Sequence, residues 1–140
     1  MERYLGLDVG EKTIGVALSD PFGMTAQGIE TIKRFSNKED FQKLKDYIDQ
    51  YEIKTVVVGL PLNMNGTLGP SGEKAKKFGE KLKNKYGVEI IFQDERMTSV
   101  SATRVLIEGN VRREKRKQYV DKIAAVFILQ SFLDTVRKDD

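Results

Sequence analysis

The chain opens with two short apolar runs, at residues 3–8 and 14–19, separated by the polar turn sequence VGEKT. Runs of this length that are rich in Val, Ile and Leu and bounded by turn residues are typical of β-strands. A third such run covers residues 24–32, after the turn Pro21-Phe22-Gly23. The pattern predicts a hairpin followed by a third strand.

The apolar spacing then changes to that of helices. Ser36 and Glu39 form an S-x-x-E capping box, and apolar residues follow at helical spacing (Phe41, Leu44, Ile48 and Tyr51). After a compact apolar strand over 55–58 comes a Gly-, Asn- and Pro-rich loop, residues 59–72. Ser71 is expected to cap a second helix that ends at Gly87. Its inward-facing residues are predicted to be Ala75, Phe78, Leu82 and Tyr86.

The last third of the chain predicts a fifth strand over 88–92, a short helix over 99–108 and a long apolar helix over 118–137. A basic loop is expected between the two helices. Strands and helices alternate after the initial hairpin, so the chain is expected to be an α/β protein with a mixed sheet and helices packed on it. The sequence contains no internal repeat or linker, which predicts a single domain over residues 1–140.

The composition excludes several kinds of catalysis. The 140 residues include no Cys and no His, so Cys-His and Ser-His-Asp mechanisms and zinc sites built from these residues are impossible. Catalysis would require carboxylates, Lys, Tyr, hydroxyls, or a hard cation held by oxygen atoms. The longest apolar run, residues 123–129, is too short to span a bilayer, and the N-terminus does not resemble a signal peptide. We therefore expect a cytoplasmic protein without a membrane partner.

The net charge is only +3, but cations are concentrated in residues 112–117. This segment contains Arg112, Arg113, Lys115, Arg116 and Lys117. Such a run is consistent with a solvated surface loop and equally with a patch that contacts phosphates.

Three acids occupy positions where a core-facing residue is expected: Asp8 at the end of the first strand, Glu95 just beyond the fifth, and Asp121 on the last helix. At about 100° per residue, Asp121 heads the apolar face of that helix. Singly, each acid has a structural explanation: a turn-capping Asp8, a Glu95 ion pair, or an Asp121 that complements the helix dipole. Together, at the carboxyl edge of an α/β sheet, they favour a site for Mg²⁺ or Mn²⁺ that hydrolyses phosphodiesters.

The sequence resembles the YqgF/RuvX family, relatives of the RuvC-type Holliday-junction resolvases. The resemblance covers nearly the whole chain and rests on LGLDVGEKTIGVALSD, VVGLPLNMNGT, QDERMTS and YVDKIAAVFILQSFL. It implies an RNase H-like fold with a five-stranded mixed sheet flanked by helices, and metal-dependent nuclease activity. The acidic positions of the family fall on Asp8, Glu95 and Asp121. The resemblance further implies a role in maturation of the small-subunit rRNA precursor, or in resolving four-way DNA junctions.

Further residues are candidates for contacting nucleic acid. Arg96 is suited to holding the scissile phosphate or to a structural salt bridge. The loop over 59–72 lacks the P-loop pattern, and its candidates are Asn63, Asn65, Gly66 and Thr67. Lys12 and Thr13 in the hairpin turn are further candidates, and the basic segment over 112–117 would make binding salt-dependent.

Two other functions remain open. Actin-like ATPases and sugar kinases also begin with a D-x-G hairpin, but they need two such domains, whereas this chain has room for one. A non-catalytic nucleic-acid-binding module is the second alternative. For the nuclease, we expect nucleic acid and pre-ribosomal particles as partners, in the form of structured RNA such as precursor rRNA, or branched DNA. We expect a monomer or a weak homodimer.

Overall fold

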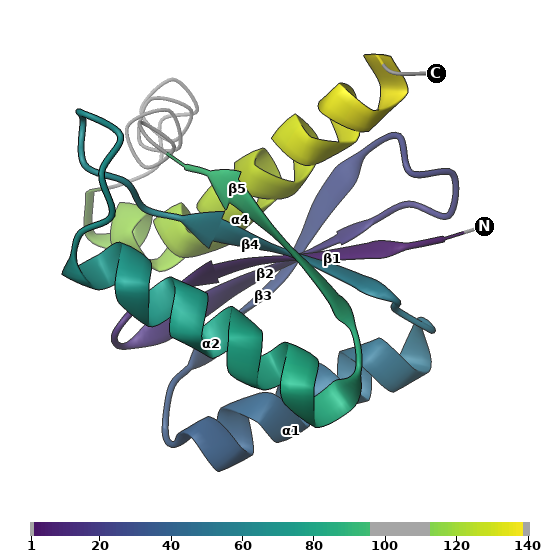
Figure 1. The fold of residues 1–140 in the computed structure, drawn as a ribbon, viewed down its shortest axis with the longest axis horizontal. Helices are drawn as coiled ribbons and strands as arrows, with labels where there is room; N and C mark the ends of the chain where they lie inside the picture. The colour runs from purple at the N-terminus through teal and green to yellow at the C-terminus, as the bar shows by residue number, and fades with distance from the viewer. Residues whose placement is uncertain (1, 96–112, 139–140) are drawn as a thin grey trace.

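A five-stranded mixed sheet forms the centre of the fold in the computed structural model, which describes residues 2–95 and 113–138 (Figure 1). Its strands are β1 (Tyr4–Val9), β2 (Thr13–Ser19), β3 (Ala26–Lys33), β4 (Thr55–Leu60) and β5 (Glu89–Asp94). In space they lie in the order β3-β2-β1-β4-β5. The first three strands pair antiparallel, whereas β4 is parallel to both β1 and β5. The predicted mixed sheet of five strands is confirmed.

Helices cover both faces of this sheet. The helices α1 (Asn37–Gln50) and α2 (Pro70–Tyr86) lie on one face, and α4 (Arg113–Lys138) crosses the other (Figure 1). Two apolar clusters result. The larger one joins the sheet to α1 and α2 and includes Leu5 and Leu7, and the smaller one joins it to α4 through Ala17 and Val57. The fold therefore has three layers, with the sheet in the middle.

The ends of α1 and α2 follow from local sequence. Ser36 caps α1 as predicted, because its Oγ accepts a hydrogen bond from the Glu39 N–H (3.2 Å). The predicted cap at Ser71 is wrong. The helix α2 begins at Pro70, two residues before the start that a cap at Ser71 implies. The fixed φ of Pro70 suits the first helical position, and the N-cap is Gly69 without a side-chain bond. Gly87 ends α2 in the left-handed conformation (φ 72°), as expected.

The last helix is longer than predicted. It begins at Arg113 instead of residue 118, so residues 113–117 of the basic segment are helical and do not form a loop. Arg, Lys and Glu are good helix formers, and the segment contains no Gly or Pro, so nothing in it stops the helix. The predicted helix over 99–108 lies outside the described residues. Among the described residues, no helix has the length and apolar character needed to cross a membrane.

A row of small residues lets α4 lie close to the sheet. Gly28, Ala17 and Gly6 are neighbours across β3, β2 and β1. A Cβ atom at Gly6 would lie 2.7 Å from the Cβ of Leu129, and one at Gly28 would lie 2.8 Å from Cγ of Lys122. Because the two glycines lack side chains and Ala17 has only a methyl group, α4 packs directly on the strands, on the face that carries the candidate site.

Candidate active site

Asp8 is the penultimate residue of β1, at the carboxyl end of the strand. Successive side chains of a strand point to opposite faces. Leu5 and Leu7 belong to the core under α1 and α2, whereas the Cα of Gly6 faces α4. Asp8 therefore lies on the α4 face of the sheet, half-buried at its edge.

Glu95 directly follows β5 and is also half-buried. Its N–H donates to the carbonyl of Leu60 at the end of β4 (3.3 Å), which fixes the backbone of Glu95 at the same edge as Asp8. The strand β4 lies between β1 and β5, so a side chain on β4 would separate the two acids. The residue of β4 that lies between them is Gly59, and a Cβ atom there would lie only 2.5 Å from Oε2 of Glu95. The carboxyl group of Glu95 thus occupies the space that Gly59 leaves open.

The two carboxyl groups are hydrogen-bonded to each other. Burial, the charge of Asp8, this hydrogen bond and the charge of Asp94 together raise the pKa of Glu95 to about 8. At neutral pH the pair therefore retains a proton, because two close carboxylates repel each other. A divalent cation fits this donor set, since its charge would replace the proton and its preferred ligands are carboxylate oxygens.

The third predicted acid, Asp121, belongs to α4, but its side chain lies outside the described part of the structure. Arg96 and Arg112 also lie outside the described residues, as do the side chains of the helical cations (Arg113, Lys115, Arg116 and Lys117). Within the described residues, no group of three or more acidic side chains forms a metal site. The structure therefore brings two of the three predicted acids together.

The β1–β2 turn, residues 10–12, begins two residues after Asp8 and contains Lys12, whereas Thr13, predicted in this turn, is the first residue of β2. The Gly10 N–H donates to the carbonyl of Thr13 (2.8 Å), and the carbonyl of Lys12 accepts from the Arg34 N–H (2.8 Å). Lys12 is exposed. The backbone of this turn is thus fixed at both ends, with Lys12 close along the chain to Asp8.

The loop between β4 and α2 is held together by its own polar groups. The Oδ1 of Asn65 accepts from the hydroxyl of Thr67 (2.6 Å), and Nδ2 of Asn63 donates to that hydroxyl (3.0 Å). Gly66 adopts a φ of 85°, which is accessible to glycine without strain. The four predicted loop residues therefore form one ordered and exposed turn beyond the carboxyl end of β4.

Sequence reasoning missed Gly59 as part of the site. A glycine inside an otherwise apolar, buried strand is a known sign that another group approaches the backbone closely. The VVVGLP sequence carries that sign, but only the pairing of β4 with β5 shows that the approaching group is Glu95.

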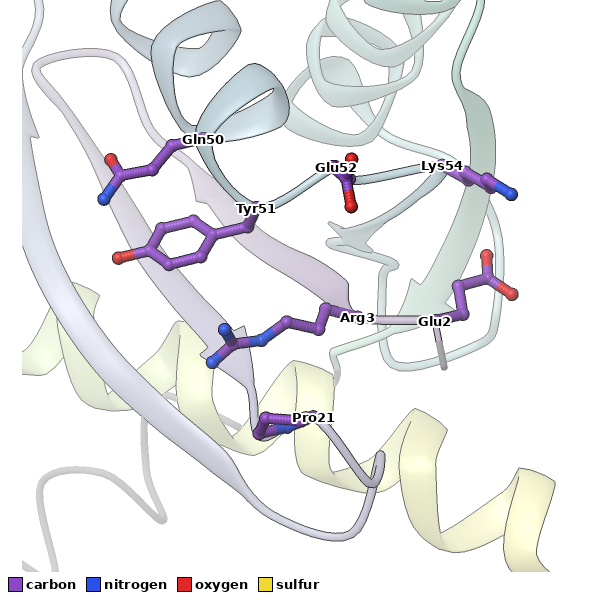
Figure 2. Close-up of a pocket in the computed structure, with 7 residues that line it drawn as sticks. All are labelled: Glu2, Arg3, Pro21, Gln50, Tyr51, Glu52 and Lys54. Carbon is purple, nitrogen blue, oxygen red and sulfur yellow. The ribbon is translucent and has the colours of Figure 1, made fainter.

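A separate cavity of about 620 Å³ lies at the other end of β1 (Figure 2). Figure 2 shows the side chain of Arg3 reaching toward the ring of Tyr51, and the guanidinium carbon is 4.9 Å from the ring centre. The Nε of Arg3 donates to the carbonyl of Ser19 (3.1 Å). Arg3 thus has a structural role through these two contacts. Neither Asp8 nor Glu95 lines this cavity.

The sequence is similar to those of known proteins over nearly its whole length. The model of the family described as "RuvX: Holliday junction resolvase" matches residues 2–135. A protein of Thermoanaerobacter pseudethanolicus named "Putative pre-16S rRNA nuclease" is 57% identical over 134 residues, covering 95% of this chain and 96% of its own. A Clostridium botulinum protein of the same name is 52% identical over 136 residues, covering 97% and 99%.

Solved structures show the same fold at low sequence identity. RuvC of T. thermophilus, in complex with a Holliday junction substrate, has a TM-score of 0.62 at 11% identity and covers 99% of this chain and 97% of its own. The Fowlpox virus resolvase, in complex with Holliday junction DNA, has a TM-score of 0.56 at 12% identity, covering 96% and 98%. These likenesses confirm the predicted RNase H-like fold of the resolvases.

Proposed function

The chain belongs to the RuvX family, and from this premise we propose that it is a nuclease that hydrolyses phosphodiester bonds at the edge formed by Asp8 and Glu95. The hydrogen-bonded pair of these carboxyl groups carries the proposal. Its geometry is unfavourable without a cation, because a half-buried acid is held protonated beside another acid. A carboxyl group whose pKa is strongly raised by a neighbouring acid is typical of functional sites, and carboxylate oxygens are the ligands that hard divalent cations prefer.

Asp8 and Glu95 would hold Mg²⁺ or Mn²⁺ together with Asp121, which we propose as the third ligand. When bound, the metal would supply activation of water and stabilisation of the charge that develops on the phosphate. The chain itself contributes rigid placement: Asp8 is fixed by a central strand, and Glu95 by its backbone bond to the end of β4. Binding of the cation would displace the shared proton of the pair.

We propose that the substrate is the precursor of the small-subunit (16S) rRNA, cut during maturation of its 5′ end on pre-ribosomal particles in the cytoplasm. This choice is supported by relatives named for pre-16S rRNA that are more than 50% identical over almost the full length of the chain. The Holliday-junction alternative is supported by the family description and by the fold. For phosphate contacts we propose Arg96, the basic segment over 112–117, Lys12, Thr13 and the ordered β4–α2 loop.

The test is a cleavage panel with Mg²⁺ or Mn²⁺, using the purified chain and three labelled substrates: a precursor rRNA fragment that includes the 5′ end of 16S rRNA, unstructured RNA, and a four-way DNA junction. We expect cleavage of the precursor fragment. Cleavage of the DNA junction alone would instead assign the resolvase function. No cleavage of any substrate, with binding retained, would assign a non-catalytic nucleic-acid-binding module.

A further inference from the structure

A basic groove runs between α1 and α2, on the face of the sheet opposite α4. It consists of two adjoining hollows, of about 240 and 410 Å³, which share Arg34, Asn37 and Lys74. Lys77 and Lys81 line one hollow and Phe35 lines the other. We call this surface the α1–α2 groove. None of its residues belongs to the site proposed above.

The groove begins beside the edge of the sheet that carries Asp8 and Glu95. The Nζ of Lys74 lies 3.0 Å from Oε1 of Glu11, and Nη1 of Arg34 donates to the carbonyl of Gly10 (2.9 Å). Gly10 and Glu11 belong to the turn that directly follows the strand of Asp8. A polymer bound at the catalytic edge could therefore continue over this turn into the groove.

The charge of the groove comes from one flank of α2. Lys74, Lys77, Lys81 and Lys85 follow one another at intervals of three or four residues, which places them along one side of the helix. Glu73 and Glu80 lie four residues before and three residues after Lys77, at the border of that flank, but neither forms an ion pair with it. Within the described residues, Lys77 and Lys81 have no ion-pair partner. The flank therefore presents uncompensated positive charge to the groove.

Two carboxylates also line the groove, and neither strongly reduces the positive charge of the lysines. Asp40 is buried and pairs with Nε of Arg34 (3.1 Å), so the two charges neutralise each other. Glu11 pairs with Lys74, but both side chains are largely exposed, at 79% and 67%. An exposed pair of this kind is weak, and a phosphate can replace the carboxylate.

An exposed aromatic ring stands at the mouth of the groove. Phe35 is 82% exposed, whereas its backbone is fixed because its N–H donates to Oδ1 of Asp40 (3.2 Å). A solvent-exposed phenyl ring on a fixed backbone, next to a row of cations, is suited to binding single-stranded nucleic acid, because bases stack on the ring and phosphates pair with the cations. An acidic peptide would pair with the cations but would offer no base to stack on the ring.

We propose that the α1–α2 groove binds an unpaired strand that flanks the cleavage site, with its phosphates on Lys74, Lys77 and Lys81 and a base on Phe35. The proposal rests on the proposed nuclease function and narrows its substrate class to nucleic acids with a single-stranded flank. Lys74 and Lys81 are about 10 Å apart along the helix axis, which provides a linear track for several phosphates.

The test measures binding without cleavage, in EDTA, by fluorescence anisotropy. The probes are a labelled RNA hairpin with an unpaired tail at its 5′ end, the same hairpin with the tail at its 3′ end, and the hairpin without a tail. We expect one of the two tails to tighten binding to the unaltered chain. The double variant Lys77→Glu/Lys81→Glu should weaken binding of that tailed probe by about tenfold and reduce its salt slope by about 1.4. Phe35→Ala should weaken it at least about fivefold.

The matched control is Lys76→Glu/Lys83→Glu, which makes the same charge change on the other flank of α2 at exposed positions. We expect it to change the affinity of the tailed probe less than twofold. An equal loss in both double variants, or no effect of either tail, would overturn the proposal. So would polyglutamate binding as tightly as polyuridylate with the same dependence on Lys77 and Lys81, because the occupant would then be an acidic protein segment.

The binding assay also separates this proposal from the nuclease function. If an unpaired tail tightens binding through the groove residues but no substrate is cut in the presence of metal, the nuclease proposal fails and the groove assignment stands. If metal-dependent cleavage occurs while neither tail affects binding, the groove assignment fails alone.

Discussion

The carboxyl groups of Asp8 and Glu95 meet in a hydrogen bond although their strands are not neighbours, because the strand between them carries Gly59 at the crossing point. Burial and the charge of Asp8 raise the pKa of Glu95 to about 8. The pair is thus protonated in the metal-free chain at neutral pH, and this property leads to the first two predictions.

The first prediction concerns stability and pH in the absence of metal. The pKa of Glu95 is higher in the folded chain than the ordinary value of 4.5, so its contribution to stability is complete below about pH 4.5 and is lost as the pH rises through 8. As the pH rises from 5 to 9 in EDTA, we expect the free energy of unfolding of Glu95→Gln to increase relative to that of the unaltered chain by on the order of 2 kcal/mol. Urea unfolding at a series of pH values measures this difference.

The control for this measurement is Glu89→Gln, an exposed residue of β5. It should leave the pH dependence of the free energy of unfolding unchanged. If Glu95→Gln shows the same pH dependence as the unaltered chain, Glu95 does not share a proton with Asp8.

The second prediction concerns metal binding. Mg²⁺ or Mn²⁺ should release close to one proton per chain at pH 7, because the cation replaces the proton of the Asp8–Glu95 pair. Titration calorimetry in buffers of different ionisation enthalpy measures the release. Glu95→Gln should bind the metal at least about tenfold more weakly and release no proton. Metal binding without proton release in the unaltered chain would contradict the assignment.

The third prediction concerns Gly59. A Cβ atom there would lie 2.4 Å from Cδ1 of Ile128 and 2.5 Å from Oε2 of Glu95, so Gly59→Ala must move both side chains. We expect a loss of stability of about 1–3 kcal/mol and, because the Glu95 carboxyl is displaced, a loss of nuclease activity of about 100-fold. Thermal unfolding and cleavage rates measure the two effects.

A double variant separates the two effects. Gly59→Ala/Ile128→Val removes Cδ1 of Ile128 and should recover part of the stability without recovering the activity. Activity that returns together with stability would show that Gly59 acts only through packing against α4.

The site could be predicted from the sequence at the positions where an acidic residue interrupts an apolar pattern. Asp8 and Glu95 were found because a carboxylate at a strand end near the core needs a partner. Gly59 could not be assigned, because its role depends on the register of β4 against β5, which arises only when the sheet assembles. The contact of Asp8 with Glu95 likewise depends on the strand order, which joins segments that are 87 positions apart in the sequence.

Local signals misled the prediction at the ends of two helices. Ser71 is a good capping residue, but Pro70 at the first helical position decided the start of α2. The cations over 113–117 suggested a loop, although helix propensity favoured the helix that forms. The α1–α2 groove could not be predicted from the sequence, because lysines at helical spacing are typical of any solvated helix face. Only the packing of α1 beside α2 places Phe35 and Arg34 near them.

The central claim is that Asp8 is a metal ligand in a nuclease, and the most direct test is the metal dependence of cleavage in Asp8→Asn. The substrate is the precursor rRNA fragment, and the control is Asp46→Asn, an exposed aspartate of α1 that makes the same change in charge. We expect the unaltered chain and Asp46→Asn to cleave at equal rates with Mg²⁺ or Mn²⁺ and not in EDTA. Asp8→Asn should retain its fold by circular dichroism and lose at least about 100-fold in rate. Cleavage by Asp8→Asn at the unaltered rate, or cleavage that persists in EDTA, would contradict the claim.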